Sequence, residues 1–322
     1  MSIFRDFFVK EKPVFTGITR GIGGFGFGGG SGGGETVFSA SGGTKSTSGL
    51  YTIHTFSYPN SDNFEVTSGS SEIEYLVVAG GGAGGGGGTL GGGGGGAGGL
   101  RSNHPEMPGP LKQPSLTISP GTYPVTVGQG GQAATATNRP TANPGNASYF
   151  AGPGLSPVQG GGGGGSGGSN PPGTAYVGDP GGSGGGGGKG FPSGSGAGGS
   201  GNKVTGTSDA APGFNPQGND GLVGSAPGSG GGGGGGALTS GGPARGDSAD
   251  PNVGGKGIPL TISGSDVTYA SGGNGQPSSA NGGNPATLTH YGEGGNAKYG
   301  NGAGASGGTG ANGIVIIRYL TP

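Results

Sequence analysis

The chain has 322 residues, of which 97 are glycine and 25 are proline, whereas only 27% are hydrophobic and 9% are charged. This apolar fraction is too small for an ordinary core throughout the chain, and the formal net charge of −1 provides no basic surface for nucleic acid. Because the chain has no cysteine and three histidines, disulfide frameworks and thiolate metal sites are excluded, and no cofactor is expected.

The first 16 residues are far richer in aromatic and aliphatic side chains than the rest of the chain. Charged residues interrupt every apolar run, so the segment predicts neither a signal peptide nor a membrane span. We expect it to anchor the chain to another protein, and the alternative is a strand or helix folded back on its own domain. The expected anchor residues are Ile3, Phe4, Phe7, Phe8, Val9 and Phe15. Residues 17–34 follow as a glycine-rich spacer.

Short strands are predicted from residue 35 onward, at 36–39, 51–56, 63–67 and 72–79, because polar and β-branched or aromatic residues alternate there. His54 is expected to be a strand residue rather than a ligand. In the strand at 72–79, odd-numbered apolar residues such as Tyr75 share one face, whereas Leu76 and Val78 occupy the other. The second half of this strand is therefore predicted to be buried on both sides.

A matching strand is predicted at 313–320, which is apolar on both faces as far as Arg318. Pairing it with residues 75–79 would close residues 35–322 into a single domain. Two hairpin-like units are predicted in between, at 116–127, where Pro120-Gly121 suits a turn, and at 260–269.

Glycine is densest at 80–99, 160–168, 181–188 and 230–236. Such tracts present no side chains to a sheet, but they readily adopt the polyproline II helix, with three residues per turn, and their backbone groups can bond neighbouring helices. No Gly-X-Y period persists, which excludes collagen. The predicted fold class is mainly β, with a small antiparallel β-sandwich, glycine-rich polyproline II-type helices and long loops.

Loops rich in proline, asparagine and serine are expected at 138–158, 170–176, 191–214 and 274–299. Loops on a rigid scaffold often carry recognition, and tyrosine supplies contact area at low entropic cost. The alternative is that these rings cap the ends of glycine helices. The candidate receptor-contact residues are Tyr149, Phe150, Tyr176, Phe191, Phe214, His290, Tyr291 and Tyr299.

No catalytic constellation is evident in the sequence. Patterns of the GxGxxG type occur by chance in so glycine-rich a chain, and none opens a helix after a strand. No nucleophile with a base and no carboxylate pair has supporting context. We therefore do not expect an enzyme.

Residues 75–82, 120–123 and 313–319, together with the opening at 2–10, resemble the glycine-rich domain of virion proteins of tailed phages, notably phages of marine bacteria including cyanobacteria. The glycine tracts also resemble the tip adhesin of T-even-type long tail fibres, in which polyglycine helices form a sandwich. The resemblance implies a virion tail fibre or appendage protein that is made in the host cytoplasm. It would be anchored to other virion structural proteins through its N-terminus.

The same resemblance implies loops that attach to a host cell-surface glycan or outer-membrane protein, and no nucleic-acid partner. Both a homotrimer and a monomer are compatible with it. The alternative is a purely structural connector or decoration protein of the head, neck or baseplate, without receptor binding.

Overall fold

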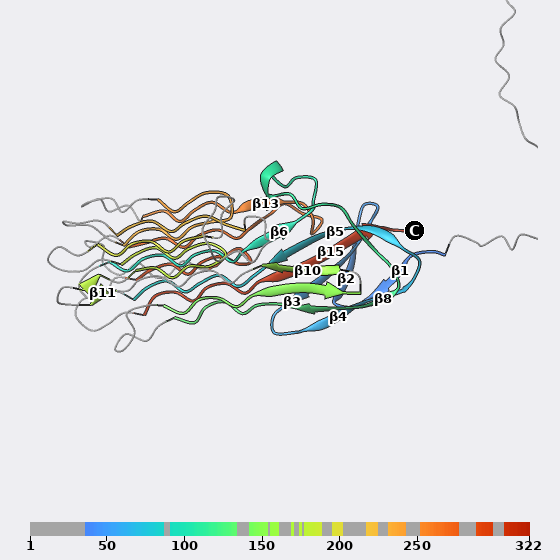
Figure 1. Ribbon diagram of the computed structural model, residues 1–322, viewed down its shortest axis with the longest axis horizontal. Helices are drawn as coiled ribbons and strands as arrows, with labels where there is room; N and C mark the ends of the chain where they lie inside the picture. The colour runs from blue at the N-terminus through green and yellow to red at the C-terminus, as the bar shows by residue number, and fades with distance from the viewer. Residues whose placement is uncertain are drawn as a thin grey trace, which may run out of the picture. The chain divides into compact units, whose positions relative to one another are not determined.

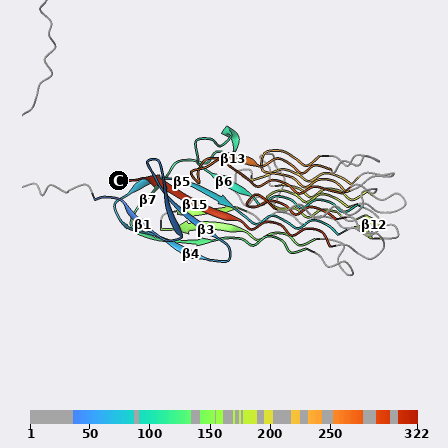
Figure 2. The ribbon, with the colours of Figure 1, turned by 180° about the vertical axis from the view of Figure 1, so that it is seen from behind.

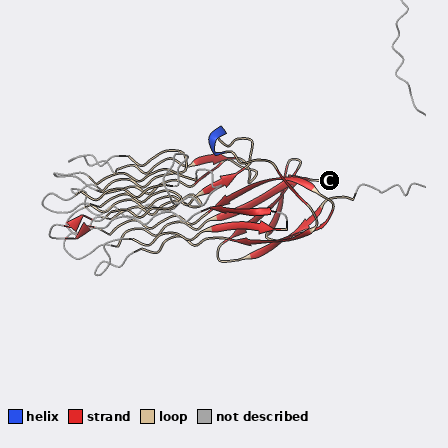
Figure 3. Ribbon diagram, in the orientation of Figure 1, coloured by secondary structure: helices blue, strands red, loops and turns tan. Residues whose placement is uncertain are grey.

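The computed structural model describes residues 36–86, 91–133, 142–153, 155–160, 169–170, 174–175, 177–188, 195–201, 217–224, 231–242, 252–276, 288–298 and 306–322. Contacts within the chain separate residues 1–35 from residues 36–322. The description below concerns the second unit (Figure 1). Most of its strands lie together at one end, and segments without regular secondary structure run from them toward the small strands at the other end (Figure 3).

The larger sheet is antiparallel and has β15 (Ile314–Leu320) at its centre. The strand order is β2 (Thr44–Ser48), β3 (Tyr51–Ser57), β15, β5 (Ser71–Val78) and β6 (Leu100–Ser102), and β7 (Leu116–Ile118) pairs with the first part of β5. Ile316 lies opposite Leu76, and both side chains are fully buried. The predicted pairing of 75–79 with 313–320 is confirmed.

The second sheet has five strands in the order β1 (Ser39–Ser41), β4 (Asp62–Ser68), β8 (Gly121–Thr126), β9 (Ser148–Gly152) and β10 (Leu155–Gly160). Aromatic and branched side chains fill the space between the two sheets, among them Phe64 and Phe150, neither of which is exposed to solvent. The two sheets therefore form the predicted sandwich.

Two sequence predictions are wrong here. Residues 116–127 do not form a hairpin, because β7 pairs with β5 in one sheet and β8 pairs with β4 in the other, so the chain crosses between the sheets near Pro120. Residues 138–158 are not only loop, because they include β9 and the first part of β10. In both places the partners that select the structure lie far away in the sequence.

The other face of the larger sheet carries a second core. It is covered by the hairpin of β13 (Ile258–Leu260) and β14 (Val267–Tyr269) and by the loop that contains the short 3₁₀ helix η1 (Gly109–Leu111). The predicted hairpin near 260–269 is confirmed, with Leu260 opposite Val267. A further small pair is formed by β11 (Ser169–Asn170) and β12 (Thr174–Ala175), so the stretch 170–176, which the sequence predicts as loop, contains strand residues.

The described glycine-rich segments, which we call the glycine body, bond to one another through their backbones with a period of three residues. From Gly80 onward, successive N–H groups donate to three different neighbours in turn, at 2.8 to 3.0 Å. Gly80 and Ala83 bond Asn146 and Asn143, Gly81 and Gly84 bond Ala311 and Gly308, and Gly82 and Gly85 bond Gly96 and Gly93. This is the period of the polyproline II helix, so the predicted packing of glycine helices is confirmed.

The glycine segments continue directly from strand ends. Residues 79–86 leave β5 and 91–99 return to β6, 128–133 continue from β8 and 142–147 return to β9, and 306–313 lead into β15. Gly86 bridges to Lys298 at the far end of these segments. The two large sheets thus occupy one end of the unit and the glycine body the other, as both views show (Figures 1 and 2).

Asn103 completes the hydrogen bonding of β5 in the gap between β6 and β7. Its side-chain Oδ1 accepts from the N–H of Tyr75 and its Nδ2 donates to the carbonyl of Ile73, both at 2.8 Å. The amide thereby replaces a peptide group of a neighbouring strand. Asparagine amides do the same in the glycine body, where Asn274 Oδ1 accepts from Gly254 and Asn296 Oδ1 accepts from Asn274.

Replacing Asn103 with alanine is expected to destabilise the fold by about 2 kcal/mol, because two buried backbone groups lose their partners. Asn63→Ala, on the exposed face of β4, is the control and should change stability by less than about 0.5 kcal/mol. Urea unfolding of both variants measures the difference. Equal stability of the two variants would contradict the role given to the Asn103 amide.

Candidate functional site

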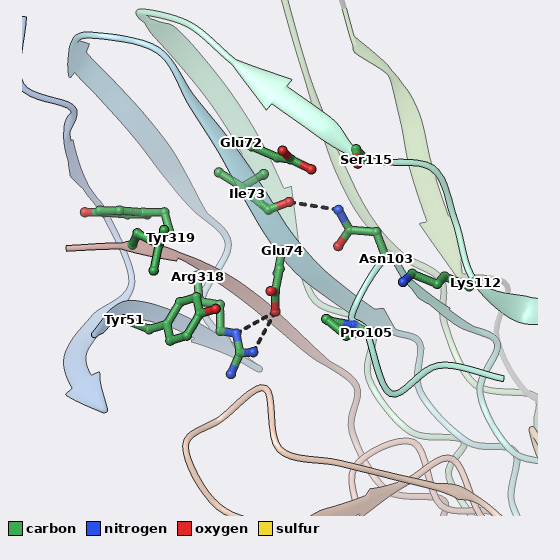
Figure 4. Close-up of a pocket in the computed structure, with 11 residues that line it drawn as sticks. Tyr51, Glu72, Ile73, Glu74, Asn103, Pro105, Lys112, Ser115, Arg318 and Tyr319 are labelled. Atoms are coloured by element: carbon green, nitrogen blue, oxygen red, sulfur yellow. Dashed lines mark hydrogen bonds and ion pairs between the residues drawn. The ribbon is translucent and has the colours of Figure 1, made fainter. Parts of the chain in front are cut away.

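The Arg318 guanidinium, on the face of β15 that is turned to the second core, contacts side chains and backbone from several elements. Its Nε and Nη2 each lie 2.7 Å from Glu74 Oε2, and its Nη1 donates to the carbonyl of Thr261 at 3.2 Å. The guanidinium carbon lies 4.2 Å from the centre of the Tyr51 ring. Figure 4 shows Arg318 between Tyr51 and Glu74. One side chain therefore joins β3, β5 and β15 to the β13–β14 hairpin.

His104 extends this arrangement, and we call Tyr51, Glu74, His104, Glu106, Thr261 and Arg318 the Arg318 cluster. His104 Nε2 lies 2.8 Å from Arg318 Nη2. Because arginine only donates, Nε2 must accept. Nδ1 lies 3.3 Å from the Glu106 backbone nitrogen and 3.5 Å from the Glu106 carboxylate. Glu106 in turn accepts from the Thr261 N–H at 2.7 Å and from its hydroxyl at 2.9 Å.

Burial of His104 and the nearby Arg318 charge lower the pKa of its imidazole below 6.5, although the carboxylates of Glu74 and Glu106 oppose this. Burial also lowers the pKa of His54, whose Nδ1 lies 2.7 Å from the carbonyl of Gly42. The fold therefore disfavours the protonated form of both rings, and the unfolded chain binds more protons than the folded one as the pH falls through about 6.5.

The free energy of unfolding is therefore expected to be highest above about pH 6.5 and to fall as the pH decreases below that value. His104→Gln should retain only the smaller pH slope that His54 contributes. The measurement is the urea midpoint at several pH values between 8 and 5, above the range in which the carboxylates titrate. An unchanged slope in the variant would contradict this assignment.

A pocket of about 320 Å³ opens beside the cluster where the covering layer of the second core ends. Glu72 and Glu74 come from β5, Tyr51 and Leu320 from the ends of β3 and β15, and Lys112 from the η1 loop (Figure 4). Its formal charges balance, and Glu74 Oε2 already accepts from Arg318. Through these contacts the arrangement joins the larger sheet to the β13–β14 hairpin.

The described part of the chain contains no group of three or more histidine, aspartate or glutamate side chains that could hold a metal ion. Within the same residues, no helix is long and apolar enough to cross a membrane.

Four predicted receptor-contact residues lie in the described part of the chain, and they are not gathered at one loop. Tyr149 is 41% exposed on β9, whereas its neighbour Phe150 is fully buried between the sheets and is not available to a receptor. His290 and Tyr291 lie in a turn where the Glu293 carboxylate accepts from the N–H of His290. Tyr291 stacks on Tyr269 of β14, which places this turn at the junction of the sheets and the glycine body.

The remaining predicted site residues lie outside the described residues. These are the receptor-contact candidates Tyr176, Phe191, Phe214 and Tyr299 and the anchor residues Ile3, Phe4, Phe7, Phe8, Val9 and Phe15. His54 is a packed strand residue, as predicted, and its Nε2 lies 3.2 Å from the Tyr319 hydroxyl.

The sequence reasoning missed the Arg318 cluster. Its one local signal is the arginine that ends the apolar run of β15, since a charge in a buried strand requires a partner. Nothing in the sequence identifies Glu74, His104 and Thr261 as that partner set, because they come from three separate segments.

Comparison with known protein families gives one clear assignment. No curated protein matches the chain significantly. The family model described as "Glycine-rich domain" matches residues 57–320, which include most strands of both sheets and the whole described glycine body. The chain therefore belongs to this glycine-rich domain family.

Proposed function

We propose that this protein is a structural component of a tailed-phage virion, a tail fibre or appendage protein that is held by its N-terminus and attaches the particle to a host surface. The observation that carries the proposal is the separation of the two ends of the unit. Phe38, near the point where residues 1–35 join, packs against Tyr319 near the end of β15, with ring centres 4.6 Å apart. The glycine segments adjoin the opposite end of that strand, at Gly313.

The glycine body suits a rigid support for recognition segments. Each of its helices is held by backbone bonds to several neighbours, as the three-residue period around Gly80–Gly85 illustrates. The described residues that flank 87–90, 134–141 and 299–305 belong to glycine segments that run away from the two large sheets, and Gly86 bridges to Lys298 there. Segment 134–141 contains threonine, asparagine and arginine, whose side chains suit hydrogen bonding to a glycan or a protein loop.

Replacing residues 134–141 with a glycine-serine segment of equal length is expected to lower the rate of phage adsorption to host cells at least tenfold. Equivalent replacements of residues 87–90 and of residues 299–305 are tested in the same assay. Thr122→Ala, on the exposed face of β8, is the control and should leave adsorption unchanged. If particles with all three replacements adsorb normally, the protein is a connector or decoration protein rather than an attachment protein.

Deleting residues 1–16 is expected to abolish incorporation into particles while leaving the thermal melting of the remaining chain unchanged. The reason is that this segment carries most of the apolar surface outside the described unit. Quantifying the protein in purified particles tests the anchor. Normal occupancy of the truncated protein would refute the anchor, and a lowered melting temperature would instead indicate that the segment completes the protein's own core.

A further inference from the structure

Three aliphatic side chains are strongly exposed at the end of the sheets opposite the glycine body. Val37 is 63% exposed, Leu50 75% and Leu320 59%. Strand pairing brings Leu50 and Leu320 together, since Leu320 lies opposite Tyr51 and the Thr321 N–H donates to the carbonyl of Leu50 at 2.8 Å. Val37 precedes Phe38, whose ring lies against Tyr319. We call Leu50, Tyr51 and Leu320 the sheet-end surface.

The sheet-end surface is continuous with the pocket beside the Arg318 cluster, because Tyr51 and Leu320 also line that pocket. Exposed aliphatic side chains around a hollow are typical of contact sites that take a protruding side chain of a partner. The lining charges of Glu72, Glu74, Lys112 and Arg318 balance, so the surface does not select a strongly charged partner. Its chemistry fits an apolar protein surface.

We propose that the sheet-end surface makes a second contact with the same virion protein that receives residues 1–16, and that this partner presents an apolar patch to it. The inference rests on the proposed function. It is supported by where the undescribed N-terminal residues join, because residue 36 precedes Val37 at this end of the sheets. Residues 17–35 span at most about 65 Å even when fully extended, so a partner bound to residues 1–16 stays near this surface.

Because residues 17–35 would tether the partner, even a weak second contact would be occupied. A short linker gives an effective concentration in the millimolar range, so a contact with a dissociation constant of about 1 mM is substantially occupied. Two attachment points fix the orientation of the protein on the particle, whereas a single attachment point leaves the protein free to rotate. Because the sheet-end surface and the glycine body lie at opposite ends of β15, the second contact directs the glycine body away from the particle.

The experiment uses particles of a phage that lacks this protein, supplemented with the purified full-length chain. After dilution, loss of the protein from particles is followed with time. Leu50→Asp combined with Leu320→Asp is expected to bind through residues 1–16 but to dissociate at least tenfold faster than the wild type. Val253→Asp, which changes a side chain that is 63% exposed on the glycine body, is the matched control and should dissociate at the wild-type rate.

Equal dissociation rates for the double variant, the control and the wild type would overturn the second contact while leaving the anchor intact. Normal retention of a chain without residues 1–16 would instead overturn the anchor. If the double substitution abolishes self-association in solution but leaves retention unchanged, the occupant is a second copy and the proposal is wrong. Should the double variant melt at a lower temperature, Leu320→Ser alone is measured, and a smaller acceleration in the same direction is expected.

Discussion

Replacing Gly234 with alanine is expected to prevent stable folding of residues 36–322. A Cβ atom at this position would overlap the carbonyl of Gly95 in the neighbouring helix. The Gly95 carbonyl cannot move away easily, because it is part of the backbone and accepts from the Gly273 N–H at 2.8 Å. We expect a loss of at least about 3 kcal/mol, because the extra atom forces helices of the glycine body apart.

Gly109→Ala is the matched control, because a Cβ there would meet no atom within 4 Å. It should fold as the wild type does. Soluble yield and the urea midpoint are measured for both variants. If Gly234→Ala were as stable as Gly109→Ala, the close packing of glycine helices would not hold the body together.

Replacing Arg318 with methionine is expected to cost about 2 to 3 kcal/mol, less than for a fully buried pair because the Glu74 side chain is 21% exposed. The substitution leaves Glu74, the Nε2 of His104 and the carbonyl of Thr261 without their shared donor. The backbone amide hydrogens of the β13–β14 hairpin and the η1 loop should then exchange with solvent faster than those of the larger sheet. Hydrogen exchange of residues 258–269 together with urea unfolding measures both effects.

Glu72→Gln serves as the control for Arg318→Met, since Glu72 is exposed, lies two residues before Glu74 and points to the same face of β5. Its effect should stay within about 0.5 kcal/mol. An equal loss in both variants would mean that general charge at this end of the sheet, rather than the Arg318 cluster, stabilises the hairpin.

The pairing of β5 with β15 and the packing of the glycine helices could be predicted from the sequence for different physical reasons. Apolar residues on both faces, as at Leu76 and Val77, require a central strand, and the only comparable run lies at 313–320. Glycine tracts have no side chains that could pack in a core, so their stability depends on hydrogen bonds between their backbone N–H and C=O groups.

Contacts between distant segments decided the strand and side-chain partners that the local sequence pattern could not identify. The stretch 116–127 has the composition of a hairpin, yet β7 and β8 gain more by completing two different sheets, and Phe150 is buried because β9 pairs with β8. The same holds for the Arg318 cluster, in which the arginine is visible in the sequence and its partners are not. Side-chain identity and periodicity determine whether a segment must be buried. Only the three-dimensional arrangement of distant segments determines which other segment it packs against. For this protein, the glycine body and the central strands belong to the first kind, and the sheet connections, the Asn103 bridge and the polar cluster belong to the second.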